Sequence, residues 1–162
     1  MSDSTHLLHD LVQISRTGTE FYEEAARSTA DKKLKRVFAD MAKAKSTLAD
    51  NLAAELKAAP KKAKPTELLE EIRKTYTGIK SVNTASITAL ELTETQLQGS
   101  LQKVVMDRDH SFVVRVLAKQ YVASAEVLKA GLRSSRRGTS RRIARPPFRS
   151  RRSWARRRSA KL

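Results

Sequence analysis

The chain has 162 residues, no cysteine, 33 Lys and Arg against 17 Asp and Glu, and a formal net charge of +16. Disulfide bonds, thiolate zinc sites and cysteine nucleophiles are therefore excluded. No apolar stretch approaches the ~20 residues that a membrane span requires, and the first residues lack the basic and apolar regions of a secretory signal. We expect a cytoplasmic protein without a membrane span.

The positive charge is concentrated at one end of the sequence. Residues 133–162, the arginine-rich segment, hold twelve Arg and one Lys with no Asp or Glu, so they carry +13 and the preceding residues carry the other +3. A segment that repels itself and has few apolar groups does not fold alone. We therefore expect one folded domain over residues 1–132, followed by a disordered tail over residues 133–162.

Ahead of the arginine-rich segment, apolar residues recur every three or four positions, the spacing that places them on one face of a helix. A first helix is predicted from near Ser4 to Ser28. Gly18 in its middle costs about 1 kcal/mol against Ala, so we expect a neighbouring helix to approach closely there. A second helix is predicted to open at Ser28 or Asp31 and to stop before Pro60.

A loop and a shorter helix are predicted next. The segment Ala58–Pro65 contains two prolines and three lysines without an apolar period, which is typical of an exposed connection. Thr66 is a suitable N-cap for a short amphipathic helix that reaches Tyr76. We expect Gly78 and Asn83 to interrupt this helix.

Two further long helices complete the predicted domain. The third main helix carries apolar residues from Ile87 to Val105, and the fourth begins around Asp107 and fades after Gly131. Four long helices of similar length with short connections favour an all-α fold, an antiparallel four-helix bundle. Apolar faces left on such a bundle could pair two copies into a homodimer.

Several short stretches of the chain resemble one protein family. They are His9-Asp10-Leu11-Val12, Thr17-Gly18-Thr19-Glu20-Phe21, Ala25-Ala26, Leu34-Lys35-Arg36-Val37-Phe38, Glu91 with Glu94, and Gln120-Tyr121 with Glu126. From Thr5 to about Leu132, and not beyond, the chain resembles the ferritin-like four-helix-bundle proteins of bacteria whose function is unassigned. The resemblance implies a ferritin-like bundle, in which a carboxylate-bridged metal pair could be held.

The residues required for such a metal pair are only partly present. A ferritin-type di-iron site needs a Glu from each of two helices and a Glu-x-x-His from each of two others. The chain contains no Glu-x-x-His. Thr47 stands where the second-helix Glu is expected, with Lys45 nearby, and Leu128 aligns with the family's histidine. Four candidate ligands for iron or another divalent metal remain: Glu20, Glu91, Glu94 and Glu126.

Glu94 lies on the apolar stripe of its helix, where an ionised carboxylate is costly without a partner. The alternative to a metal is that Glu94 meets a lysine or a hydroxyl group from another helix. His6 with His9, and His110 with Asp107, have the spacing of a surface metal site, although helix starts also collect Asp as caps. Neither a nucleophile elbow nor a phosphate-binding glycine loop occurs, so no feature of the sequence supports enzymatic activity, and apart from the metal considered above we expect no cofactor.

The arginine-rich segment combines arginine clusters with Phe148 and Trp154. Guanidinium groups pair bidentately with phosphates, and aromatic rings can stack on exposed bases. This composition favours salt-sensitive binding to nucleic acid or another polyanion. The residues predicted to bind are Arg136, Arg137, Arg141, Arg142, Arg145, Arg149, Arg151, Arg152, Trp154, Arg156, Arg157 and Arg158.

Two functional hypotheses and one question of origin stay open. The first hypothesis is a non-enzymatic bundle that its basic tail holds to a polyanion, and the second is a divergent ferritin-like metal protein with an incomplete carboxylate site. Residues 1–132 use fourteen Lys and six Arg, whereas the arginine-rich segment uses one Lys and twelve Arg. An out-of-frame reading of a GC-rich sequence can produce such a change, so the segment is either a genuine binding arm or an accidental terminus.

Overall fold

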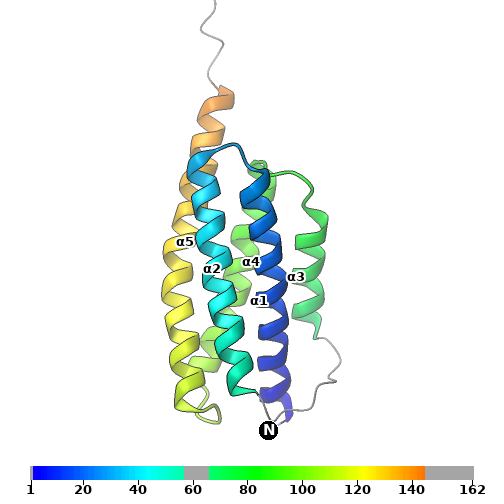
Figure 1. The fold of residues 1–162 in the computed structure, drawn as a ribbon, viewed down its shortest axis with the longest axis vertical. Coiled ribbons are helices and arrows are strands. Elements are labelled where there is room, and N and C mark those ends of the chain that lie inside the picture. The colour runs from blue at the N-terminus through cyan, green and yellow to red at the C-terminus, as the bar shows by residue number, and fades with distance from the viewer. Residues whose placement is uncertain (1, 57–65, 145–162) are drawn as a thin grey trace, which may run out of the picture.

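The computed structural model describes residues 2–56 and 66–144, and helices are the only regular secondary structure within those ranges (Figure 1). The predicted all-α class is therefore confirmed. The described part contains five helices, which are α1 (Ser2–Ser28), α2 (Lys32–Glu55), α3 (Glu67–Gly78), α4 (Thr84–Met106) and α5 (Phe112–Ala144).

The five helices run alternately up and down one long axis (Figure 1). Helix α1 packs against α2 and α3, helix α5 packs against α2 and α4, and α3 also contacts α4, so the helices close a ring. The predicted four-helix bundle is corrected by this arrangement. The short helix α3 is a fifth member of the ring because its apolar side, formed by Leu69, Ile72 and Tyr76, is buried.

Side chains close to the predicted boundaries start three of the helices. The Asp31 side chain accepts hydrogen bonds from two backbone N–H groups at the start of α2, and Thr66 accepts one at the start of α3. Asn83 and Ser86 form a reciprocal capping box at the start of α4. The caps at Asp31 and Thr66 confirm the sequence predictions, whereas Asn83 was predicted only to interrupt the preceding helix. The predicted loop Ala58–Pro65 lies outside the described residues.

Helix α5 extends beyond its predicted end. The sequence predicted that this helix would fade after Gly131 and that disorder would begin at Arg133, but helical backbone continues to Ala144. Ser135, inside the arginine-rich segment, is only 8% exposed. The packed region therefore crosses the predicted domain boundary, and residues 145–162 lie outside the described part of the chain.

The inner faces of the helices form one apolar core. The predicted inner stripe of α1 is buried at most of its positions, and the other four helices contribute matching stripes. Among the helices that the structure describes, none combines the length and the apolar composition needed to cross a membrane. Core side chains less than 2% exposed include Leu11, Ile14, Phe38, Met41, Leu52, Leu69, Ile72, Ile87, Leu90 and Leu97.

Candidate functional site

A polar cluster interrupts the apolar core, and we refer to it as the central cluster. Its middle is the carboxylate of Glu94 on α4, with a side chain 1% exposed. The ammonium group of Lys45 on α2, 0% exposed, lies 2.8 Å from Glu94 Oε1. Lys45 Nζ also donates a hydrogen bond to the hydroxyl of Tyr121 at 2.9 Å. Each charge would be costly to bury alone, so their pairing is what allows both to occupy the core.

All three tyrosines of the chain direct their hydroxyl groups at this carboxylate. Tyr22 on α1 and Tyr76 on α3 donate to Glu94 Oε1 at 3.1 and 3.5 Å. Tyr121 on α5 donates to Glu94 Oε2 at 3.1 Å. Since Lys45 comes from α2, every helix of the ring supplies one member of the central cluster.

The environment keeps these three phenols protonated. Burial raises the pKa of Tyr22, Tyr76 and Tyr121 well above the ordinary value, and the negative charge of Glu94 raises each pKa further. The hydroxyl groups therefore remain hydrogen-bond donors at neutral pH. Four donors thus surround one carboxylate, with three of them on Oε1 and one on Oε2, and Lys45 compensates its charge.

Gly18 on α1 provides the space that Lys45 occupies. A Cβ atom at Gly18 would lie 2.6 Å from Lys45 Cδ and 3.1 Å from Tyr76 Oη. The predicted close approach at this glycine is confirmed, and the approaching group is the aliphatic part of a lysine side chain from α2. The prediction that Glu94 meets a lysine or a hydroxyl group from another helix is also confirmed. The sequence indicated neither which lysine this would be nor that three hydroxyl groups would converge.

The four candidate metal ligands do not gather at one place. Glu94 is engaged in the central cluster, while Glu91 is 12% exposed and pairs with arginines of α5. Glu126 is 65% exposed and lies 3.5 Å from Lys129 Nζ, and Glu20 is exposed on α1. Within residues 2–56 and 66–144, no three His, Cys, Asp or Glu side chains are placed to hold a metal ion. The metal site stays a prediction that rests on the family resemblance.

The histidines occupy separate surroundings. His110 is buried, and its Nε2 lies 3.6 Å from Asp107 Oδ2, an interaction within the turn between α4 and α5. His6 and His9 are partly buried near the start of α1, and His9 Nε2 has no hydrogen-bond partner among the described residues. The predicted pair His110 and Asp107 is thus a contact within one turn of the chain. The predicted metal site at His6 and His9 stays a prediction.

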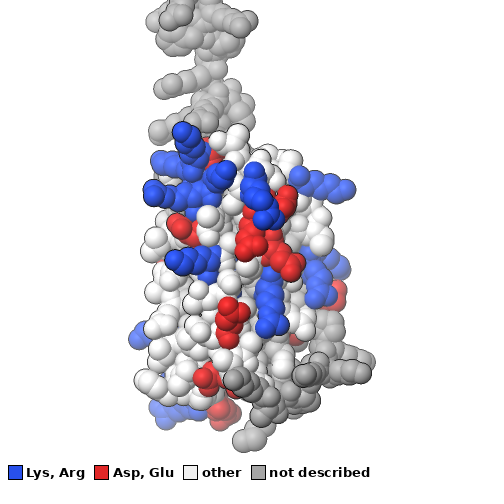
Figure 2. All heavy atoms as spheres, viewed as in Figure 1, with Lys and Arg blue, Asp and Glu red and all other residues white. Residues whose placement is uncertain are grey.

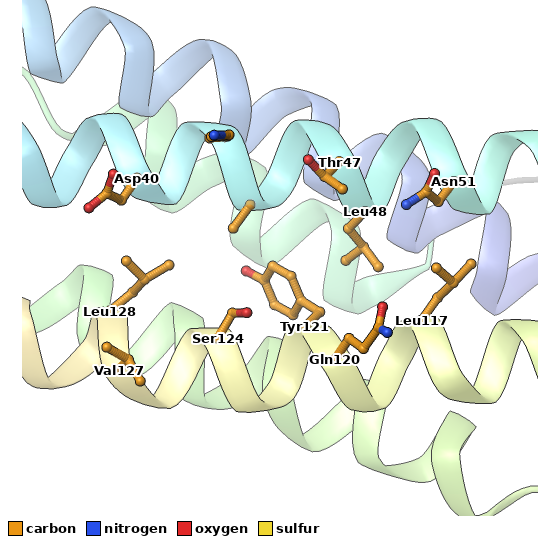
Figure 3. Close-up of a pocket in the computed structure, with 12 residues that line it drawn as sticks. Asp40, Thr47, Leu48, Asn51, Leu117, Gln120, Tyr121, Ser124, Val127 and Leu128 are labelled. Carbon is orange, nitrogen blue, oxygen red and sulfur yellow. The ribbon is translucent and has the colours of Figure 1, made fainter.

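A groove of about 540 Å³ runs between α2 and α5 (Figure 3). Tyr121 lies in this groove and, through its hydroxyl, also belongs to the central cluster. Polar side chains from both helices line the groove beside apolar ones, including the 73% exposed Val127. The lining residues shown in Figure 3 include Asp40, Thr47, Leu48, Asn51, Leu117, Gln120, Ser124, Val127 and Leu128.

The arginine-rich segment begins within the packed part of α5. Arg136 is partly buried, donates to Thr88 Oγ1 at 3.3 Å and lies 3.5 Å from Glu91 Oε1. Arg133 is half-exposed and lies 3.7 Å from Glu91 Oε2. Of the other residues predicted to bind a polyanion, Arg137, Arg141 and Arg142 belong to α5, and Arg145, Arg149, Arg151, Arg152, Trp154, Arg156, Arg157 and Arg158 lie outside the described residues.

Five helices around a lysine–glutamate–tyrosine cluster define an all-α protein whose polar centre is occupied by its own side chains. Residues 3–107 match a family described as a domain of unknown function (DUF2383), and the chain belongs to this family. The matched region covers α1 to α4 and four of the five members of the central cluster, while α5 follows it. Comparison with curated proteins and with solved structures gives no significant match.

Proposed function

We propose that this protein is a non-enzymatic helical bundle that attaches to nucleic acid through its arginine-rich segment. The observation that carries the proposal is the separation of charge along the chain. Residues 133–162 carry +13 without one acidic residue, while the residues before them carry +3. Each Lys or Arg that neutralises a phosphate releases a counterion, so a dense basic segment binds nucleic acid at low salt without reading its sequence.

The course of α5 supports this function. The helix continues through the first arginines and extends past the ends of the neighbouring helices (Figure 1). Because a helix packed in the bundle leads directly into the arginine-rich segment, the bundle and the binding segment are joined by regular structure. Such a connection would hold the bundle close to any polyanion that the segment binds.

The chemistry of the residues favours nucleic acid over a membrane surface. Arginine forms bidentate hydrogen bonds with phosphate, and Phe148 and Trp154 offer rings for stacking on unpaired bases. Insertion into a lipid surface requires a broad apolar face beside the basic one. The sequence from 145 to 162 has only two large aromatic residues among its arginines, so it has no such face.

The non-enzymatic part of the proposal rests on the central cluster. Its carboxylate is paired with a lysine and accepts hydrogen bonds from three phenols, and all of these groups are buried. A general base or a nucleophile must reach a substrate with a free lone pair. The arrangement instead suits a structural role, in which one polar contact joins all five helices.

The test compares the full chain with a variant in which Arg149, Arg151, Arg152, Arg156, Arg157 and Arg158 are all changed to Gln. Binding to a short duplex DNA is measured by fluorescence anisotropy over a range of salt concentrations. Loss of six charges should reduce the slope of log affinity against log salt by up to about 5, at about 0.9 for each phosphate contact. A second variant with Lys at the same six positions should keep most of that slope.

Equal binding by the full chain and the Gln variant would contradict the proposal. Iron content is measured on the same purified samples, because stoichiometric iron would instead favour the metal-binding hypothesis. Competition with heparin or inorganic polyphosphate shows whether the segment distinguishes nucleic acid from other polyanions. Displacement of the DNA by either competitor at a much lower concentration of anionic groups than the DNA supplies would reassign the ligand.

A further inference from the structure

The start of α2 carries a second concentration of positive charge. Lys32, Lys33, Lys35 and Arg36 are four of the first five residues of this helix, and all four are exposed. The first turn contains no acidic residue. Among the described residues, none of these four side chains takes part in an ion pair. We refer to these four residues as the basic turn.

Helix stability does not account for the basic turn. The N-terminal end of a helix carries a partial positive charge, so acidic residues are favourable there and lysines and arginines are unfavourable. Helix α3 follows this rule, with Glu67 and Glu70 in its first turn. Helix α2 does the opposite, and only the N-cap Asp31 contributes negative charge at its start. Free cations placed against the helix dipole indicate a role outside the folding of α2.

The basic turn lies beside the part of α5 that leads into the arginine-rich segment. A Cβ atom at Gly131 of α5 would be 3.0 Å from Val37 Cγ2, so the two helices are in close contact next to Arg36. Two positions of the basic turn also continue the side of α2 that faces α5. Asp40 and Lys43 line the groove between the helices. Along the same side of α2, Arg36 lies one turn and Lys33 two turns before Asp40.

The surface view agrees with this placement. Figure 2 shows Lys and Arg side chains gathered over the upper parts of α2 and α5, next to the point where the chain leaves the described region. In the same view, acidic groups lie mainly over α1 and below this area. Positive charge from two helices that are distant in the sequence thus meets at one end of the bundle.

We propose that the basic turn of α2 is a surface that binds the phosphate backbone of nucleic acid, beside the part of α5 that leads into the arginine-rich segment. This inference rests on the proposed function and extends it from the arginine-rich segment to the folded bundle. The surface contacts phosphates rather than bases, because its side chains are lysines and arginines on a convex helix face. It also places a binding element inside the region matched by the family, since residues 32–36 lie within 3–107.

The experiment uses two full-length variants with equal loss of charge. In the first, Lys32, Lys33, Lys35 and Arg36 are changed to Gln, a residue that α2 accommodates well. In the control, Lys74, Lys103, Arg108 and Lys119, which are exposed on other parts of the bundle, are changed to Gln. Both variants lose three lysines and one arginine. Affinity for duplex DNA is measured against salt for both, together with thermal unfolding.

The variant of the basic turn should lose about tenfold or more in affinity at low salt, and its salt slope should fall by about 2 to 4. The control should change affinity by about twofold or less. The melting temperature of the first variant should be unchanged or higher, because charges that oppose the helix dipole are removed. A fall in melting temperature together with lost binding would assign the basic turn to folding and overturn the inference.

The remaining outcomes separate the two proposals. Equal weakening by both four-residue variants would mean that only net charge matters, and the basic surface would be rejected. If the unaltered chain binds DNA through the arginine-rich segment and the basic-turn variant binds equally well, the inference fails while the proposed function stands. If the unaltered chain does not bind DNA at any salt concentration, the proposed function itself fails.

Discussion

Lys45 Nζ and Glu94 Oε1 lie 2.8 Å apart in the core, and their side chains are 0% and 1% exposed. Two opposite charges at this separation stabilise each other only as long as both are present. A single substitution removes the attraction and leaves the other charge buried without a counter-charge. The stability of the bundle should therefore be highly sensitive to the loss of either charge of this pair.

Lys45→Met should lower the free energy of unfolding by about 3–5 kcal/mol, because Glu94 remains charged in the core without its cation. The double variant Lys45→Met with Glu94→Gln should recover part of this loss, since neither buried charge remains. Urea unfolding followed by circular dichroism measures each value. The exposed pair Glu24–Arg27 is the control, and Glu24→Gln should leave the unfolding midpoint unchanged. Additive effects at Lys45 and Glu94 would contradict the predicted coupling.

The stability of the fold should fall at alkaline pH through the three tyrosines. Burial and the charge of Glu94 raise the pKa of each phenol in the folded state. Below the unfolded pKa of about 10 both states keep their protons, so this contribution is complete there. Above it the unfolded chain loses protons that the folded chain retains, and stability falls by up to about 1.4 kcal/mol per pH unit for each tyrosine.

A combined titration checks this alkaline loss of stability. The chain has only three tyrosines, so its tyrosinate absorbance reports on the central cluster alone. Absorbance and helical circular dichroism should change together in one transition as pH rises. Tyrosinate formation near pH 10 with full helical signal would show that the phenols are not held protonated by the fold.

Gly18→Ala should destabilise the protein even though alanine favours a helix. The added Cβ would lie 2.6 Å from Lys45 Cδ, and the displaced lysine is held by contacts in the core, so we expect a loss of about 1–3 kcal/mol. Gly99→Ala on α4 is the matched control because no atom lies within 4 Å of its added Cβ. That control should gain about 1 kcal/mol from helix propensity. The two unfolding midpoints should therefore shift in opposite directions.

Glu91→Gln should strengthen DNA binding. Glu91 lies 3.7 Å from Arg133 and 3.5 Å from Arg136, so it competes with phosphate for the first two arginines of the arginine-rich segment. Their release should steepen the salt slope by about 1 to 2. Glu126→Gln removes the same charge beside Lys129 and is the control. If both variants gain equally in affinity, the effect is one of net charge and not of released arginines.

Predictions that depend on a few neighbouring residues were the accurate ones. The caps at Asp31 and Thr66 act on backbone N–H groups two or three residues away, so the local sequence contains the whole interaction. The end of α5 was predicted wrongly from composition. Arginine is a good helix former, and extending a helix that is already packed avoids the cost of nucleation, so charge alone did not end this helix.

The sequence by itself determined the helical class, the starts of α2 and α3, the separation of charge and the need of Glu94 for a partner. Each of these follows from residue spacing or composition. The tertiary structure decided that the partner is Lys45, that Tyr22, Tyr76 and Tyr121 join it, and that α3 completes the ring. These contacts depend on the rotation and axial offset of each helix, which are fixed only when all five helices pack together.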